Sequence, residues 1–222
     1  MTDTCKTGLV LEGGGMRGVF TAGVLDFFLD KEISFDTCMG VSAGSCHACS
    51  YLSRQRGRAY AVSVDYLEDE RYCSLKSLIK TGDLFGADMC YKKIPDELLP
   101  YDYPAYDRNP TDFYAVVTNC RTGKAEYKKI GDMRKGIYYV RASSSLPLLS
   151  RTLWIQGQPY LDGGISDSIP IKKSQELGNQ KNVVVLTRDR NYRKGPNQAM
   201  PLIRLRYQRE FPRLVEKMRD RH

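Results

Sequence analysis

The chain contains little histidine and no long apolar run. Histidine occurs only twice, at positions 47 and 222, and tryptophan occurs once. No apolar stretch approaches the roughly 20 residues that span a bilayer, and no basic segment followed by an apolar one opens the chain. These absences argue against a membrane span and against a secretory leader. They predict a protein that is made and kept in the cytoplasm.

The seven cysteines do not form the pattern of a disulfide framework, because their number is odd and their spacing is irregular. Cys46 and Cys49 form a CxxC pair, which in other contexts marks a redox or zinc site. A zinc ion would need two further ligands, and the sequence offers no second CxxC and only His222 at its end. We expect the pair to lie on a helix packed under a sheet, and we expect no metal and no organic cofactor.

The composition is that of an ordinary globular protein. Of the 222 residues, 41% are apolar and 27% are charged. This length predicts one α/β domain over residues 1–222, since domains usually have about 100–200 residues. The formal net charge is +8, with much of the excess after residue 185. No nucleic-acid-binding motif accompanies the charge, so no nucleic-acid partner is expected.

The basic C-terminal stretch also carries apolar residues at roughly helical spacing. They are Leu202, Leu205, Phe211, Leu214, Val215 and Met218. Apolar residues at this spacing, with arginines and lysines between them, predict an amphipathic surface helix. The alternative is a helix that contacts an anionic membrane surface.

The first half of the chain predicts a parallel sheet. An apolar strand over 8–12 is followed by a glycine-rich turn and a helix over 19–29, and a short strand over 35–40 is again followed by a small-residue turn and a helix. Strand, turn and helix in repetition favour a mainly parallel sheet with helices on its faces. Residues 61–110 lack a long periodic run, which predicts short helices and loops over one end of the sheet.

The second half adds further strands and helices. Residues 113–120 and 125–130 predict two strands joined by a tight turn, and a second hairpin surrounds Gly157. The remaining predictions are a helix over 131–142, a helix from about Pro170 and a strand over 182–187.

The first glycine-rich turn, GGGMRG at 13–18, has two interpretations. Gly13, Gly15 and Gly18 match the G-x-G-x-x-G spacing of a dinucleotide-binding turn. That use requires an acidic residue at the end of the second strand, whereas Asp36 stands at its beginning. Glycines at a strand-to-helix turn also let backbone N–H groups approach an oxyanion. The turn alone leaves both interpretations open.

The second turn, GVSAG at 40–44, matches G-x-S-x-G. In a nucleophile elbow the serine occupies a strained turn between strand and helix, and the small residues at −2 and +2 let the two elements crowd together. The pattern here follows a predicted strand and opens a predicted helix, which favours Ser42 as a nucleophile with Gly40 and Gly44 in support. The amides of Gly14 and Gly15 are then candidates for an oxyanion hole.

A serine nucleophile needs a base, and neither histidine suits that role. His47 lies five residues after Ser42 on the same predicted helix, and His222 ends a charged tail. Asp162, in DGG after a predicted strand, is the alternative base, because Gly163 and Gly164 free the backbone to present its side chain. On its own this segment is equally typical of an Asp-Gly turn.

Together these segments resemble the patatin-like phospholipase family. GGGMRG at 13–18, GVSAG at 40–44 and DGG at 162–164 match the family's three signatures in order, and RASSSLPLLS at 141–150 is also similar, so the resemblance spans about residues 8–190. It implies a three-layer α/β/α fold and hydrolysis of lipid acyl esters by a Ser–Asp dyad, here Ser42 and Asp162. It further implies an oxyanion hole made by the glycine loop, with these members: Gly13, Gly14, Gly15, Arg17 and Gly18.

The chain departs from the family pattern in two places. Glu12 stands where the family often has an aspartate, and the chain stops soon after the strand near residue 187, so we expect a C-terminal portion to be missing. Two other functions remain open. One is a non-catalytic protein that binds a nucleotide, phosphate or lipid through the glycine loop, and the other is a thioesterase or protein deacylase with the same dyad.

Overall fold

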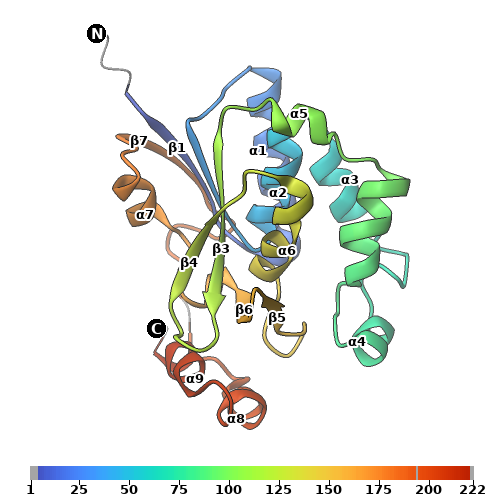
Figure 1. The fold of residues 1–222 in the computed structure, drawn as a ribbon, viewed down its shortest axis with the longest axis vertical. Helices are drawn as coiled ribbons and strands as arrows, with labels where there is room; N and C mark the ends of the chain where they lie inside the picture. The colour runs from blue at the N-terminus through green and yellow to red at the C-terminus, as the bar shows by residue number, and fades with distance from the viewer. Residues whose placement is uncertain (1–4, 194, 221–222) are drawn as a thin grey trace.

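A mixed sheet runs through the molecule and helices cover its faces (Figure 1). The computed structural model describes residues 5–193 and 195–220, and within them seven strands form one sheet. The strand order is β5-β6-β3-β2-β1-β7, with β4 paired to β3 beside this path. The predicted α/β class with a mainly parallel centre is confirmed.

The centre of the sheet is parallel and buried. It consists of β1 (Thr7–Leu11), β2 (Thr37–Val41), β3 (Asp112–Asn119) and β7 (Lys181–Val185). All five residues of β2 are buried, as expected for a parallel strand covered on both faces. The carboxyl ends of β1 and β2 therefore meet at the same edge, where Leu11 pairs with Gly40.

Three shorter strands join the sheet antiparallel. They are β4 (Ala125–Lys129), β5 (Leu153–Ile155) and β6 (Gln158–Asp162). Both β4 and β6 pair with β3, and in the β3–β6 register Asp162 lies opposite Val117. Val41 of β2 pairs with the neighbouring Val116. The end of β6 is thus brought to the level at which β2 ends.

Helices pack on both faces of the sheet. The larger core lies under α1 (Val19–Asp30), α2 (Ala43–Leu52) and α6 (Met133–Ser143), where Leu9 and Leu11 of β1 join the apolar side chains of these helices. Gly8 points the other way, toward Ser174 of α7 (Ile171–Glu176). Figure 1 shows α7 across the sheet from α1, α2 and α6. The CxxC residues lie on α2, as predicted.

The region after α2 forms an outer layer of short helices. It contains α3 (Arg58–Val64), α4 (Leu75–Thr81), the π-helical segment η2 (Met89–Leu98) and α5 (Tyr103–Asp107). Short helices were predicted here, but the ten-residue η2 was not. Pro95 lies inside it, and proline within a candidate helix normally signals a break. The wider π turn accommodates it: the Leu99 amide donates to the Ile94 carbonyl, five residues back.

The predicted C-terminal amphipathic helix is wrong in two respects. The segment forms two helices, α8 (Met200–Tyr207) and α9 (Pro212–Arg219), because Pro212 begins a new helix. In α8 the buried face carries Ile203 and Tyr207, four residues apart, whereas Leu202 and Leu205 are 60% and 85% exposed. The apolar residues of α9 do pack inward: Leu214, Val215 and Met218 are buried.

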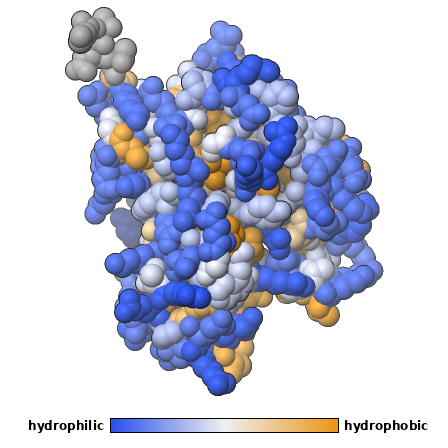
Figure 2. Space-filling view, in the orientation of Figure 1, coloured by the Kyte–Doolittle hydropathy of each residue, from blue (hydrophilic) through white to orange (hydrophobic). Residues whose placement is uncertain are grey.

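Strongly exposed apolar side chains occur on α4 and α8, among other places. Figure 2 shows apolar surface over α8 at the lower edge and, separately, by α4. In α4, Leu75 and Ile79 are both strongly exposed and lie one helical turn apart. No helix in the described part of the chain is long and apolar enough to cross a membrane.

Candidate active site

Ser42 occupies a strained turn between β2 and α2. Its backbone has φ 54° and ψ −125°, a region that residues other than glycine rarely adopt. The turn is held from both sides: the Ser42 amide donates to Ser143 Oγ at 2.9 Å, and the Ser42 carbonyl accepts from the amides of Ser45 and Cys46 to begin the helix. The G-x-S-x-G pattern thus produces a sharp turn in this chain.

The glycines on either side of Ser42 are required by close packing. A Cβ on Gly40 would lie 2.5 Å from Ser45 Cα, and a Cβ on Gly44 would lie 2.5 Å from the Leu11 carbonyl oxygen. Both distances are far below ordinary contact, and both involve backbone atoms, which cannot easily move away. Strand β2, helix α2 and strand β1 can approach this closely only because both positions lack a side chain.

Asp162 lies directly beside Ser42 although 120 residues separate them. Ser42 Oγ donates to Asp162 Oδ2 at 2.7 Å, and both residues are buried, with 8% and 2% of their surfaces exposed. The second carboxylate oxygen, Oδ1, accepts from the Gly164 amide at 2.7 Å. These bonds fix the plane of the carboxylate and leave Oδ2 directed at the serine.

The backbone around Asp162 is held as firmly as its side chain. The Asp162 carbonyl accepts from Thr118 Oγ1 at 2.8 Å, which ties the end of β6 to β3. The short helix η3 (Gly163–Ile165) then begins at Gly163, where a Cβ would collide with the Val116 carbonyl. The DGG segment therefore passes over β3 at a distance that only glycine permits.

The glycine loop lies against the same serine. A Cβ on Gly13 would be 2.7 Å from Ser42 Cβ, so the loop backbone runs next to the Ser42 side chain. Gly15 has φ +54° and opens the short helix η1 (Gly15–Gly18). The amides of Gly14 and Gly15 donate to no acceptor within residues 5–193 and 195–220, so they are available to a group bound there.

Arg17 and Gly18 occupy different surroundings from the three preceding glycines. The Arg17 side chain is exposed, and its amide donates to the Gly14 carbonyl at 3.2 Å. Gly18 is buried, and a Cβ there would lie 2.6 Å from His47 Nε2. Gly18 lets η1 pack on α2.

The loop is anchored by a residue that follows β7. Glu12 Oε2 accepts from the Thr187 amide at 2.6 Å and from Thr187 Oγ1 at 3.2 Å, while Thr187 Oγ1 also lies 2.8 Å from the Gly13 carbonyl. Sequence reasoning missed both Thr187 and Ser143. The signal for Thr187 was a polar residue at the end of the strand predicted over 182–187; Ser143 lies in the family-like segment 141–150, which assigned it no role.

The histidines do not take part in this cluster. His47 is buried in α2, where its Nε2 lies beside Gly18, and burial lowers the pKa of the imidazole from 6.5 to about 4. Ser42 Oγ donates to Asp162, not to His47. His222 lies outside the described residues.

A mainly apolar cavity of about 140 Å³ opens beside Ser42. Its walls come from α2, α3, η2 and the segment after α6. Met16, Leu146 and Leu149 line it and are also partly exposed, so the cavity reaches the surface next to the serine. Such a cavity suits a flexible apolar chain attached to a group at Ser42.

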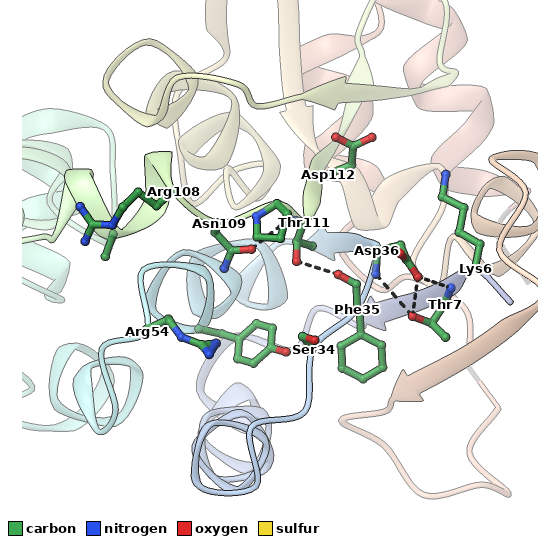
Figure 3. A pocket seen from close by; sticks show the side chains of 13 residues that line it. Lys6, Thr7, Ser34, Phe35, Asp36, Arg54, Arg108, Asn109, Thr111 and Asp112 are labelled. Atoms are coloured by element: carbon green, nitrogen blue, oxygen red, sulfur yellow. Dashed lines mark hydrogen bonds between the residues drawn. The ribbon is translucent and has the colours of Figure 1, made fainter. Parts of the chain in front are cut away.

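A larger and more polar pocket, of about 760 Å³, lies at the opposite edge of the sheet (Figure 3). Asp36 lies there and accepts from the Thr7 amide at 2.7 Å and from Thr7 Oγ1 at 2.8 Å, as the dashed lines in Figure 3 show. Since Asp36 precedes β2 and the glycine loop follows β1, the two parts of a dinucleotide motif stand at opposite ends of parallel strands. This arrangement argues against a dinucleotide on the loop.

Comparison with known proteins agrees with this geometry. The family model described as Patatin-like phospholipase matches residues 9–173. The uncharacterized protein YjjU of Escherichia coli (strain K12) is 32% identical over 190 residues, which cover 82% of this chain and 52% of YjjU. Lysophospholipase nte1 of Aspergillus niger is 28% identical over 184 residues, and lysophospholipase NTE1 of Chaetomium globosum is 27% identical over 182 residues.

The chain spans about half of YjjU but only 11% of each fungal protein, while those matches cover 78% of the chain itself. The region matched by the family model includes the glycine loop, the Ser42 turn and the end of β6 with Asp162. The chain therefore belongs to the patatin-like phospholipase family, a family of lipid acyl hydrolases.

Proposed function

We propose that this protein is a serine hydrolase that cleaves acyl ester bonds of phospholipids or related lipids through a Ser42–Asp162 dyad. The observation that carries the proposal is the buried 2.7 Å hydrogen bond from Ser42 Oγ to Asp162 Oδ2, located between a glycine loop and an apolar cavity. A serine bonded to a carboxylate, with backbone donors and an apolar cavity beside it, matches the requirements of acyl transfer.

In the first half of the reaction, Asp162 Oδ2 accepts the proton of Ser42 Oγ while Oγ attacks the ester carbonyl carbon. The carbonyl oxygen becomes an oxyanion, and the Gly14 and Gly15 amides donate to it. When the tetrahedral intermediate collapses, the bond to the alcohol oxygen breaks and that oxygen takes the proton from Asp162. The alcohol leaves, and the acyl group remains as an ester of Ser42.

In the second half, a water molecule replaces the alcohol. Asp162 accepts a proton from this water as it attacks the acyl-serine, the same amides hold the second oxyanion, and the proton returns to Ser42 Oγ as the fatty acid departs. The acyl chain occupies the apolar cavity throughout. No step requires a metal or an organic cofactor.

The environment of His47 supports a carboxylate base. An imidazole whose pKa burial lowers to about 4 is neutral near pH 7, but its position beside Gly18 directs it toward the helix η1 instead of toward Ser42 Oγ. Asp162, in contrast, already accepts the hydrogen bond of the nucleophile. Arg17, exposed next to the loop, is suited to meeting a lipid phosphate rather than the oxyanion.

The proposal includes contact with an anionic membrane surface. Leu202 and Leu205 of α8 are exposed, and the last turn of that helix carries Arg204 and Arg206. Apolar side chains flanked by arginines are the composition of helices that lie in a membrane interface. A protein that works from the cytoplasmic side would meet anionic lipid there, and the cytoplasmic location itself stays a prediction.

A fluorophosphonate probe tests the nucleophile. We expect a covalent adduct on Ser42, located by mass spectrometry of the digested protein, and no adduct in the Ser42→Ala variant. An adduct on another serine, or none on folded protein, would refute the assignment and favour a non-catalytic binding protein. Turnover of an acyl thioester but not of the matching oxygen ester would instead indicate a thioesterase.

A pair of variants tests the base. Asp162→Asn keeps the shape but removes the proton acceptor, and we expect ester hydrolysis to fall by about 10²–10⁴-fold, the usual contribution of a general base. His47→Gln is the matched control and should keep most of the activity. If the two variants lose activity equally while circular dichroism shows that both are folded, the dyad is wrong and His47 becomes the candidate base.

A further inference from the structure

The apolar cavity follows one face of α2 away from Ser42. Ala43, Cys46, His47 and Ser50 all line it, and their spacing of three and four residues places them on one side of the helix. From residue 42 to residue 50 the helix advances about 12 Å at roughly 1.5 Å per residue. An extended chain advances about 1.2 Å per bond, so the cavity matches an acyl chain of about ten bonds.

The far end of this cavity is not apolar. Arg58, the first residue of α3, lines the cavity and is only 8% exposed. Its Nη1 lies 3.5 Å from Ser50 Oγ, a long contact, and its Nη2 donates to the Leu99 carbonyl at 3.0 Å. A guanidinium group therefore lies roughly two helical turns from Ser42, at the position where an acyl chain would end.

The charge of Arg58 is not neutralised by the protein around it. Among the described residues no carboxylate forms an ion pair with Arg58, and its buried Nε has no hydrogen-bond partner. The ring of Tyr101 stacks on the guanidinium at 5.2 Å, which compensates only in part. Burying a cation without a counter-charge is unfavourable, so a bound anion would remove an existing penalty.

Resting on the function proposed above, we propose that Arg58 selects acyl chains that end in a carboxylate. The substrate class is then an ester whose acyl group is a dicarboxylic chain of about eight to ten carbons, with one end at Ser42 and the other at Arg58. The terminal carboxylate accepts from Nη1, whose 3.5 Å contact with Ser50 Oγ is weak. The apolar walls between the two ends hold the methylene groups.

The test uses two esters with the same leaving group. They are p-nitrophenyl decanoate and the p-nitrophenyl monoester of sebacic acid, which has the same chain length but a carboxylate in place of the methyl end. We expect kcat/KM of the wild-type protein to be about ten- to a hundredfold higher for the sebacate ester, the range that hydrogen bonds to a charged group provide. The ratio of the two values is independent of the active-enzyme fraction.

Variants assign this preference to one side chain. Arg58→Met keeps the length and removes the charge, so the ratio should fall to one or below, and Arg58→Lys should restore part of it. Arg56→Met removes an exposed arginine of the same segment, which is paired with Asp30, and should leave the ratio unchanged.

The two proposals fail in different ways. If neither ester is hydrolysed and Ser42 takes no fluorophosphonate, the proposed function itself is wrong. If decanoate is hydrolysed as well as or better than sebacate by the wild-type protein, the hydrolase stands and the role of Arg58 is refuted; this comparison needs no variant to fold. A sebacate preference that survives in Arg58→Met would also refute it.

Discussion

The strained backbone of Ser42 predicts that this residue destabilises the fold. With φ 54° and ψ −125°, Ser42 holds a conformation that costs a residue with a Cβ about 1–3 kcal/mol. Alanine at this position keeps the strain, whereas glycine relieves it. The pair Ser42→Ala and Ser42→Gly therefore isolates the strain, because both variants lose the same hydrogen bond to Asp162.

The expected difference follows from two opposing terms. Glycine gains back the strain of about 1–3 kcal/mol, and it loses about 0.4–1 kcal/mol because a glycine makes the unfolded chain more flexible. Ser42→Gly should therefore be more stable than Ser42→Ala, by about 1 kcal/mol in the middle of this range. Ser45, inside α2 with ordinary helical geometry, gives the control: there glycine should be less stable than alanine by about 1 kcal/mol.

Urea unfolding followed by circular dichroism measures all four variants. With a slope of about 3 kcal/mol per molar urea, each difference of 1 kcal/mol moves the midpoint by about 0.3 M, in opposite directions at the two positions. If Ser42→Gly unfolds at lower urea than Ser42→Ala, as at Ser45, then the turn is not strained and the argument fails.

Three further predictions concern other parts of the molecule. Because burial lowers the pKa of His47 to about 4, the unfolded chain binds a proton that the folded chain does not between about pH 6.5 and pH 4. As the pH is lowered through that interval, the free energy of unfolding should fall by about 3 kcal/mol. Urea titrations at several pH values should show this fall in the wild-type protein and not in His47→Gln. Gly44→Ala should lower the melting temperature and cost about 1–3 kcal/mol of stability, because the new Cβ would lie 2.5 Å from a backbone atom. Gly23→Ala is the control: its Cβ would lie in open space on α1 and should raise the melting temperature slightly. Equal effects of the two variants would contradict the packing argument. Binding to anionic vesicles in a sedimentation assay should weaken as salt rises and should weaken further in Leu205→Glu, while equal binding to neutral vesicles would show that the charge excess is only solvated surface.

Much of the fold could be predicted because the relevant signals are local. Apolar runs and glycine turns identified the first two strand–turn–helix units, and the G-x-S-x-G and DGG segments, with the resemblance that they carry, drew attention to Ser42 and Asp162. Their catalytic roles stay predictions, but the structure brings the two side chains into hydrogen-bond contact. Local sequence signals were sufficient to predict those elements whose position depends mainly on their own segment.

The errors have a common physical origin in contacts between distant segments. Ser143 and Thr187 support the site through hydrogen bonds to residues 101 and 175 positions away, and the patterns of their own segments did not indicate these contacts. One C-terminal amphipathic helix was predicted across Pro212, with Leu205 on its apolar face, whereas Ile203 and Tyr207 fill the buried face of α8. Helical spacing alone does not reveal which of two apolar faces finds a partner.

The anchoring of the glycine loop by Thr187 has a consequence for synthesis. Ser42 leaves the ribosome early, yet Asp162 and then Thr187 must follow before the anchored loop, Ser42 and Asp162 lie together. The 145 residues between positions 42 and 187 take roughly 7–29 s to translate at about 5–20 residues per second. During that interval the nascent chain carries Ser42 without Asp162 and Thr187, so under the proposed mechanism an unfinished chain would lack the base and the anchored loop that ester cleavage requires.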